Sequence, residues 1–313
     1  MSLVRFVLRG IVLPIGAVSA AAAIIALGGR FSGRLDILTH FAPLYLAGGA
    51  VTLAAAIFAH RRLLPALLGA AAVVASLSLM LPELLRPQSP RLPPNAPGQI
   101  KLIQFNAARD SDGLEQRLAW LAAEDPDVLV VEDSRPLFQT AVTQRLGRQM
   151  SCGKTCEVAI FTRTPAERIE APRRGRKGLG PAITIAHLAG PSGEFTVMGV
   201  HYVWPTNVEN HAENSARLQQ LMKGRSRERL ILVGDFNSTP WSFSRRREDA
   251  ALGLERRTYA LPTWPADRPF GLALLPIDHV YAGSDWGTVS ITRGPRLGSD
   301  HYPVVAVLAP KSN

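Results

Sequence analysis

The chain contains 313 residues and carries a formal net charge of +10, with a pI near 10.3. This length is sufficient for one large domain and an additional segment. Residues 1–90 contain seven Arg against two acidic residues (+5), and residues 91–313 contain 28 basic against 23 acidic residues (+5). Half of the basic excess therefore lies beside apolar segments, where arginines bear on membrane orientation. The high pI is thus weak evidence for a nucleic-acid-binding surface.

Three long apolar runs dominate the first part of the chain. Gly10–Gly29 and Leu63–Pro82 are each uncharged over 20 residues, and Ile37–Ala59 contains only the ionisable His40. Each run is long enough to cross a bilayer core of about 30 Å. No charge interrupts the runs to make a polar helix face, which argues against buried helices of a soluble protein. We therefore expect three transmembrane helices within residues 1–85.

The arginines around these runs predict an orientation. The positive-inside rule places the arginine-rich side, which holds the N-terminus and the turn at residues 60–62, in the cytoplasm. With three spans, the chain after Pro82 then lies outside. A cleaved signal peptide is the competing interpretation of the first run, which is rich in alanine and follows two arginines. The arginines counted are Arg5, Arg9, Arg61 and Arg62 on one side, and Arg30 and Arg34, offset by Asp36, on the other.

A proline-rich stretch separates the apolar region from the rest. Residues 86–99, "RPQSPRLPPNAPGQ", contain five prolines, which is typical of a semi-extended linker. Beyond it lie the two cysteines of the chain, Cys152 and Cys156. In an exported domain this close pair indicates a small disulfide loop, whereas a cytoplasmic domain would keep two free thiols. A zinc site would need four ligands, and no second pair has suitable spacing.

Strand-like and helical runs alternate from Ile100 onward. Many short apolar strands with few long helices predict an α+β domain over residues 100–310, with two packed sheets and helices outside. The expected strands are residues 100–105, 127–132, 157–162, 182–188, 195–201, 229–235, 277–282 and 302–308. The expected helices are Leu114–Ala123, Leu137–Leu146 and Val208–Met222.

Polar residues stand at the ends of six of these apolar strands. If the strands lie side by side, these groups converge on one cleft. Such a set suits metal-assisted hydrolysis of a phosphate ester, because Mg²⁺ or Mn²⁺ needs hard oxygen ligands, a carboxylate can orient water, and amides and histidines can bind phosphoryl oxygens. The residues are Asn106, Glu132 and Asp133, His201, Asp235 and Asn237, Asp278 and His279, and Asp300 and His301.

The segments "QFNA", "VVEDS", "GVHY", "GDFN", "IDHV" and "GSDHYPV", in that order, resemble the endonuclease/exonuclease/phosphatase (DNase I-like) superfamily over most of residues 100–309. This resemblance implies a four-layer α/β/β/α sandwich of two mixed sheets and a Mg²⁺- or Mn²⁺-dependent phosphoester hydrolase. The apolar spans and linker look like the membrane-tethered bacterial branch. That branch implies an inner-membrane protein with an extracytoplasmic, periplasmic catalytic domain.

The resemblance assigns three residues to the metal. Glu132 matches the metal-binding glutamate, with Asp133 beside it as the alternative. Asn106 matches the asparagine that supports the metal and nucleophile site, and Asp300 matches a further carboxylate on the metal side. Asp235 matches the aspartate that orients the attacking water.

The remaining roles concern the phosphate and the catalytic histidine. Asn237 and His201 match residues that contact the phosphate. His301 matches the catalytic histidine, and Asp278 the aspartate that fixes its imidazole. His279 is expected to be structural, because the family pattern uses the aspartate that precedes it.

Basic and aromatic residues near these motifs leave the substrate open. The clusters Arg173–Lys177, Arg225–Arg229 and Arg245–Asp249 are by default solvated loops, but they could also meet nucleic-acid phosphates or anionic lipid headgroups. Trp204 and Trp241 could stack on a base, contact lipid or pack in the core.

Three hypotheses follow. They are a membrane-anchored phosphodiesterase acting on nucleic acid, a phosphatase or pyrophosphatase of lipid-linked phosphates, and a non-catalytic membrane module. No obligate protein partner is evident from the sequence.

Overall fold

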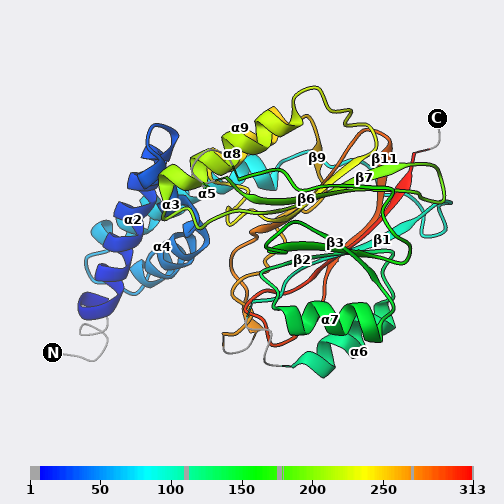
Figure 1. The fold of residues 1–313 in the computed structure, drawn as a ribbon. Helices are drawn as coiled ribbons and strands as arrows, with labels where there is room; N and C mark the ends of the chain where they lie inside the picture. Colours follow the sequence, from blue (N-terminus) through cyan, green and yellow to red (C-terminus); the bar gives the residue numbers. More distant parts are fainter. Residues whose placement is uncertain (1–7, 109–112, 175–177, 179, 269–270, 312–313) are drawn as a thin grey trace. The chain divides into compact units, whose positions relative to one another are not determined.

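The computed structural model describes residues 8–108, 113–174, 178, 180–268 and 271–311 (Figure 1). Arg5 and residues 175–177 of the first basic cluster lie outside this range. The chain forms two compact units. The helical unit comprises residues 1–86 together with Thr239–Arg247, and the sandwich unit comprises Pro87–Ser238 together with residues 248–313. The helical unit is therefore discontinuous in sequence.

The apolar runs of the first 86 residues are helical, as expected. Two helical stretches, Gly10–Arg30 and Leu63–Leu84, are long and apolar enough to cross a membrane. A third span results only if two helices bent by 55° are counted together. The elements are η1 (Leu8–Val12), α2 (Leu13–Ala26), η2 (Leu27–Arg30), α3 (Gly33–Thr39), α4 (Ala42–Ala56) and α5 (Leu63–Leu84).

The second apolar run is thus two helices rather than one. α3 ends at Thr39 and α4 begins at Ala42, with Pro43 in its first turn. Proline has no amide hydrogen to continue a preceding helix, and it is favoured in the first turn of a new one. The break therefore falls where the local sequence favours a new helix start.

Two mixed sheets form the centre of the sandwich unit. Among the described residues, each sheet has six strands, in the orders β11-β12-β1-β2-β4-β3 and β5-β6-β7-β8-β10-β9. The first sheet contains β1 (Ile100–Asn106), β2 (Val128–Glu132), β3 (Gln149–Cys152), β4 (Val158–Thr162), β11 (Trp286–Arg293) and β12 (Val304–Pro310). The second contains β5 (Arg168–Glu170), β6 (Ala182–Leu188), β7 (Phe195–His201), β8 (Leu230–Asp235), β9 (Glu255–Arg256) and β10 (Asp278–Ala282).

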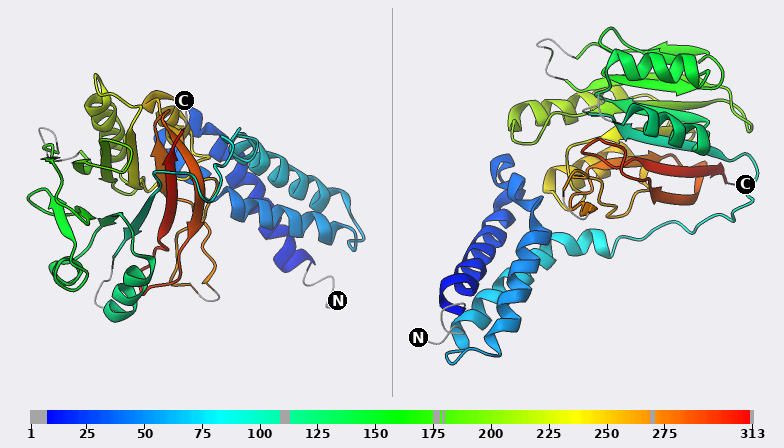
Figure 2. Two further views of the ribbon diagram at one scale, coloured as in Figure 1. Left: turned by 90° about the vertical axis from the view of Figure 1, so that its right-hand side faces the viewer. Right: turned by 90° about the horizontal axis from the view of Figure 1, so that it is seen from below.

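Alternating side chains of each strand build the layers of this unit. In β1, Leu102 joins the core between the two sheets, and Ile103 joins the core beneath α6 (Leu114–Glu124) and α7 (Pro136–Arg145). The outer face of the second sheet packs against α8 (Val208–Met222). Figures 1 and 2 show this order of helix, sheet, sheet and helix, which confirms the expected four-layer sandwich. The remaining helix, α9, covers Phe243–Leu252.

The structure also shows the proline-rich stretch and the two cysteines. Part of the proline-rich stretch lies against β11, because Arg91 bridges Thr288 and Leu92 donates its amide to the Thr288 carbonyl at 2.8 Å. Cys152 and Cys156 form a disulfide across a Cα–Cα distance of 5.0 Å, as the exported-domain interpretation predicts. This bridge closes the turn between β3 and β4.

Candidate active site

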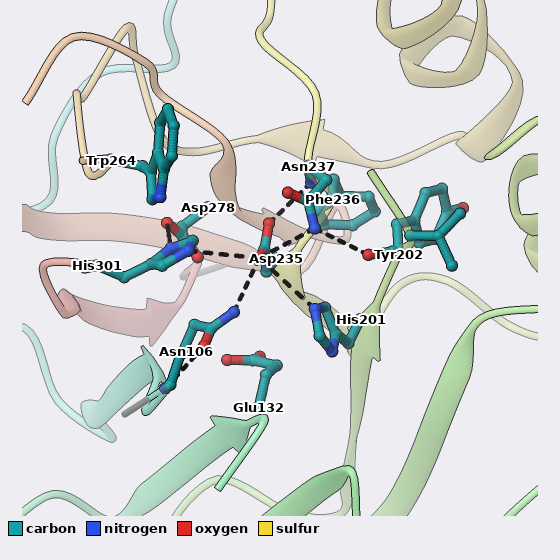
Figure 3. A network of polar contacts seen from close by, with 12 residues as sticks. Asn106, Glu132, His201, Tyr202, Asp235, Phe236, Asn237, Trp264, Asp278 and His301 are labelled. Atoms are coloured by element: carbon teal, nitrogen blue, oxygen red, sulfur yellow. Dashed lines mark hydrogen bonds and ion pairs between the residues drawn. The ribbon is translucent and has the colours of Figure 1, made fainter. Parts of the chain in front are cut away.

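Strand pairing brings the polar strand ends together (Figure 3). Asn106 and Glu132 are register partners in the parallel pair β1–β2. His201 and Asp235 are register partners in the parallel pair β7–β8, and Asp278 is the antiparallel partner of Asp235 in β10. Because the carboxyl ends of β1, β2, β7 and β8 meet at one edge of the sandwich, four separate segments and β10 supply one cluster.

A glycine immediately before Asp235 permits this arrangement. Gly234 has φ of +151°, and a Cβ at this position would lie 1.9 Å from the carbonyl oxygen of Val200. Only glycine can occupy such a conformation at such an approach. The glycine of "GDFN" therefore sets the spacing between β7 and β8 next to the carboxylate.

Asp235 is held by two asparagines. Asn106 donates from Nδ2 to Asp235 Oδ2 at 2.9 Å. The backbone amide of Asn237 donates to Asp235 Oδ1 at 2.7 Å, and Asn237 Nδ2 donates to Asp235 Oδ2 at 3.2 Å and to the Tyr202 carbonyl at 2.8 Å. Asn237 has φ of +48°, a left-handed conformation that asparagine adopts readily. Both donor hydrogens of its amide are engaged, so in this arrangement Asn237 orients Asp235; its contact with phosphate stays a prediction.

His301 and Asp278 form a buried pair. His301 Nδ1 lies 2.9 Å from Asp278 Oδ2, and His301 Nε2 lies 3.8 Å from Asp235 Oδ2. The Ser299 hydroxyl accepts from the His301 amide and donates to the Asn106 carbonyl, so it joins the last motif to the first. The imidazole is thus oriented with Nε2 toward the site.

The protonation of this pair follows from burial and charge. Burial lowers the pKa of His301, but the carboxylates of Asp278 and Asp235 outweigh it and raise the pKa to about 9. Burial raises the pKa of Asp278, but His301 brings it below its ordinary value. At neutral pH the pair is therefore an imidazolium beside a carboxylate.

The pKa values of two other carboxyl groups are raised, in contrast to that of Asp278. Burial, followed by the charge of Asp278, raises the pKa of Asp235 to about 6. Burial and the neighbouring carboxylates raise the pKa of Glu132 well above its ordinary value. Three carboxylates in one dry cluster repel each other, which is the environment that a divalent cation relieves.

Two carboxylate oxygens in the site lack partners among the described residues. Glu132 Oε2 accepts from Gln104 at 2.9 Å, but its buried Oε1 has no hydrogen-bond partner there. Asp300 Oδ2 accepts from the Trp264 indole at 3.2 Å, and its Oδ1 is likewise buried without a partner. Hard, unsatisfied carboxylate oxygens fit Mg²⁺ or Mn²⁺. Asp133 is exposed, so Glu132 is the better candidate of this neighbouring pair.

A second grouping could also hold an ion. Asp235, Asp278 and His301 offer one ligand atom each, all within 4.8 Å of one another. The 2.9 Å hydrogen bond between His301 and Asp278 already occupies two of these groups. We therefore regard this trio as a proton-handling group and the Glu132 oxygen as the candidate ligand.

His201 lies on the opposite side of Asp235. Its Nε2 is 3.7 Å from Asp235 Oδ2, and its Nδ1 is 3.4 Å from Glu157 Oε1. Burial lowers the pKa of His201, but Glu157 and Asp235 together bring it above its ordinary value. Glu157 Oε1 in turn forms an ion pair with Arg174 Nη2 at 2.7 Å. A second imidazole, whose cationic form these carboxylates favour, therefore faces Asp235.

Sequence reasoning missed three supporting residues. Gln104 donates from Nε2 to both Glu132 Oε2 at 2.9 Å and Asp278 Oδ1 at 2.7 Å, so one amide joins the metal-side and histidine-side carboxylates. Glu157 and Ser299 are the others. Gln104 had a detectable signal, because it is a polar residue inside an apolar strand and shares a strand face with Asn106 two residues later.

The structure also shows the surroundings of His279, which was expected to be structural, and of the two tryptophans whose roles the sequence left open. His279 lies 2.8 Å from the Ser238 carbonyl and 3.3 Å from the Thr258 hydroxyl, a structural role. Trp204 is half exposed and stacks edge-on against Trp264 with ring centroids 5.1 Å apart, whereas Trp241 is buried.

Comparison with solved structures identifies proteins that share this fold. The catalytic domain of human Nocturnin with a bound sulfate anion matches with a TM-score of 0.55 and 18% identity, over 71% of this chain and 97% of that chain. D. rerio TDP2 complexed with a single-strand DNA product matches with a TM-score of 0.54 and 13% identity, over 67% and 98%. A mannosyl-6-phosphatase of Bacteroides thetaiotaomicron matches with a TM-score of 0.51 and 18% identity, over 67% and 99%.

At these identities the structural likeness shows the fold alone. Among curated proteins, none matched the sequence. A model of the Endonuclease/Exonuclease/phosphatase family matches residues 95–301, which is more than half of the chain. This chain therefore belongs to the Endonuclease/Exonuclease/phosphatase family, whose members are hydrolases acting on phosphate esters.

Proposed function

We propose that this protein is a membrane-anchored phosphoester hydrolase that depends on Mg²⁺ or Mn²⁺. The observation that carries this proposal is Glu132 Oε1, which is buried near the carboxylates of Asp278 and Asp235 and has no hydrogen-bond partner among the described residues. Glu132 would hold the metal, with Asn106 and Asp300 supporting the same side. When bound, the ion would supply positive charge to a non-bridging phosphoryl oxygen.

The remaining catalytic roles are activation of the attacking water and stabilisation of the negative charge that develops. Asp235, held by Asn106 and Asn237, orients a water and accepts its proton as the water oxygen bonds to phosphorus and the ester bond breaks. A pKa near 6 suits Asp235 to that task at neutral pH. His301, fixed by Asp278, presents a cationic N–H group where negative charge develops, and His201 presents a second imidazole whose pKa is raised.

We propose a lipid-carried phosphate ester as the substrate class, with nucleic acid as the alternative. The apolar helices support the first choice, because tethering raises the local concentration of a membrane substrate. The disulfide supports a location outside the cytoplasm, in line with the arginine distribution and an inner-membrane anchor. The family fold itself does not select a substrate, because specificity lies in the loops around the site.

The test uses the full chain in lipid nanodiscs with Mg²⁺, Mn²⁺ or EDTA. Phosphate release from polyprenyl phosphates and phospholipids is compared with nicking of plasmid DNA. We expect lipid turnover that EDTA abolishes and that Asp235→Asn lowers by about 10²–10⁴-fold. Glu170→Gln is the matched control, because this carboxylate binds Arg225 and His187 and none of the candidate site residues. DNA nicking without lipid turnover would select the nucleic-acid alternative, and neither activity nor metal binding would select the non-catalytic module.

A further inference from the structure

One segment of the helical unit follows directly on the catalytic motif. Thr239–Arg247 belongs to the helical unit by its contacts, although it begins two residues after Asn237. The chain enters this segment from Ser238 and leaves it at Glu248, both of which belong to the sandwich unit.

Asp36 of α3 holds the start of α9. Its carboxylate is buried, Oδ1 accepts the amide of Phe243 at 2.8 Å, and Oδ2 accepts the amide of Ser244 at 2.8 Å. The first amides of a helix have no intrahelical partners, and a carboxylate there also complements the helix dipole. A residue distant in sequence thus caps the first two amides of α9, and Ser242 accepts the amide of Arg245 at 3.2 Å. Two hydrogen bonds also account for a carboxylate buried at the start of an apolar run.

His40 holds the beginning of the same segment. Its Nδ1 lies 2.8 Å from the Thr239 hydroxyl and accepts the Thr239 amide at 3.2 Å. The imidazole is therefore unprotonated at Nδ1 in this arrangement. Asp36 and His40, one helical turn apart, fix two points of the segment.

The packing around these contacts is close. A Cβ at Gly29 would lie 2.7 Å from Asp36 Cα and 3.0 Å from the Phe243 ring. Glycine is needed at this position for η2, α3 and the segment to approach so closely. The contact is therefore built into the packing of the helical unit.

Both flanks of the segment are hydrogen-bonded to residues of the sandwich unit, and one of these bonds leads to the active site. On one flank, the Ser238 carbonyl accepts from His279 at 2.8 Å. On the other, Glu248 Oε1 accepts from the Tyr202 hydroxyl at 2.5 Å. The Tyr202 carbonyl accepts from Asn237, and Asn237 orients Asp235. A path of hydrogen bonds through Glu248 and Tyr202 thus leads from the end of the segment to Asn237, which holds the carboxylate of Asp235.

We propose that Asp36 and His40 are positioning residues for phosphoester hydrolysis. They hold Thr239–Arg247 in the conformation that keeps Asn237 and Asp235 aligned, so the helical unit contributes to turnover as well as to anchoring. This inference rests on the proposed function for its catalytic part.

The kinetic test uses the full chain in nanodiscs and bis(p-nitrophenyl) phosphate, a water-soluble ester whose access does not depend on lipid. Asp36→Ala should lower kcat by about 10- to 100-fold and leave KM within about twofold, because misplacement of reacting groups acts on the transition state. Asp36→Asn keeps one acceptor oxygen, so its kcat should lie between those of the native chain and Asp36→Ala. His40→Ala should act in the same direction. Arg34→Ala, an exposed change on the same helix, should leave both constants unchanged.

A second readout needs no turnover. Trypsin should cut Asp36→Ala at Arg245–Arg247 faster than it cuts the native chain or Arg34→Ala, with the sandwich unit melting at an unchanged temperature. Equal cleavage rates would show that Asp36 does not hold the segment and would overturn the proposal. Unchanged kcat in Asp36→Ala, together with inactive Asp235→Asn, would overturn the positioning role and leave the proposed function standing. Native protein without turnover on this ester or on any substrate of the preceding test would overturn the proposed function and, with it, the catalytic part of this inference.

Discussion

Asn106 donates its side-chain amide to Asp235 over 2.9 Å, and this bond joins the ends of two strands that lie in different sheets. The same asparagine accepts the amide of Ala108 at 3.1 Å through Oδ1. Both ends of its amide are thus used in holding a turn and a carboxylate together. The site is therefore a product of how the two sheets pack, since neither sheet alone positions Asp235.

Replacing Asn106 tests this link. Asn106→Ala removes a donor from a buried carboxylate, and we expect the free energy of unfolding to fall by about 1–3 kcal/mol. We also expect kcat to fall by about tenfold or more, because Asp235 loses its orientation. Urea unfolding and steady-state kinetics measure the two effects. Full activity in a stable Asn106→Ala protein would contradict the role assigned to this bond.

The pair of Asp278 and His301 predicts a pH effect. A folded-state pKa near 9, above the ordinary 6.5, means that protonated His301 contributes stability that is complete below about pH 6.5 and is lost as the pH rises through 9. Asp278→Asn removes a carboxylate that raises this pKa. The variant should therefore lose its imidazolium at lower pH.

We expect the alkaline limb of the kcat profile to move toward neutral pH in Asp278→Asn, and the fall in stability between pH 6.5 and 9 to shrink. His279→Gln, on the neighbouring residue, is the control and should keep the native alkaline limb. An alkaline limb at the same pH in Asp278→Asn and in the native chain would show that another group titrates there.

Gly234 predicts a backbone effect beside the site. Gly234→Ala would place Cβ 1.9 Å from the Val200 carbonyl oxygen, a contact that only a backbone shift relieves. We expect a loss of about 3 kcal/mol or more in the free energy of unfolding. Gly147→Ala is the matched control, because Gly147 also has positive φ but no described atom lies within 4 Å of the position that its Cβ would take. It should lose only about 1 kcal/mol. Similar losses in both would rule out the steric explanation.

The ion pairs of Glu170 predict that the stability of the fold changes at acidic pH. Hydrogen bonds from Arg225, at 3.1 and 2.6 Å, and from His187 lower the pKa of Glu170 from 4.5 to about 2. A lowered pKa contributes stability that is complete above about pH 4.5 and is lost as the pH falls through 2. Glu170→Gln should be less stable than the native chain at pH 7, and the difference should close toward pH 2. A gap that persists at pH 2 would contradict the ion-pair origin.

Much of the sandwich unit could be predicted from the sequence, because its strands are apolar runs with polar ends. The eight expected strands and the helix Val208–Met222 are present. The polar strand ends converge because parallel neighbours place the same ends at one edge. Four strands were not predicted. β3, β5 and β9 have only two to four residues, which carry no usable periodicity, whereas β11 has eight residues but a mixed polar and apolar sequence, "WGTVSITR".

Other features depend on contacts between distant residues. α9 has the charged sequence "FSRRREDAAL", and its first two amides are accepted by the distant Asp36, while the adjacent Ser242 accepts only the amide of Arg245. From the sequence alone, Asp36 is only a charge that offsets nearby arginines. The role of Gln104 could not be predicted either, because its two partners, Glu132 and Asp278, come from strands in different sheets.

The discontinuity of the helical unit bears on how the protein is made. Domains generally fold as units and in N-terminal order during synthesis. Here the apolar helices leave the ribosome first, but the amides of Phe243 and Ser244 that Asp36 accepts follow only after β8. The carboxylate of Asp36 therefore lacks these two donors until most of the sandwich unit has been synthesised. The helical unit can therefore be completed only after β8 and the segment that follows it have been synthesised. A chain that ends before Phe243 lacks the amides that Asp36 accepts.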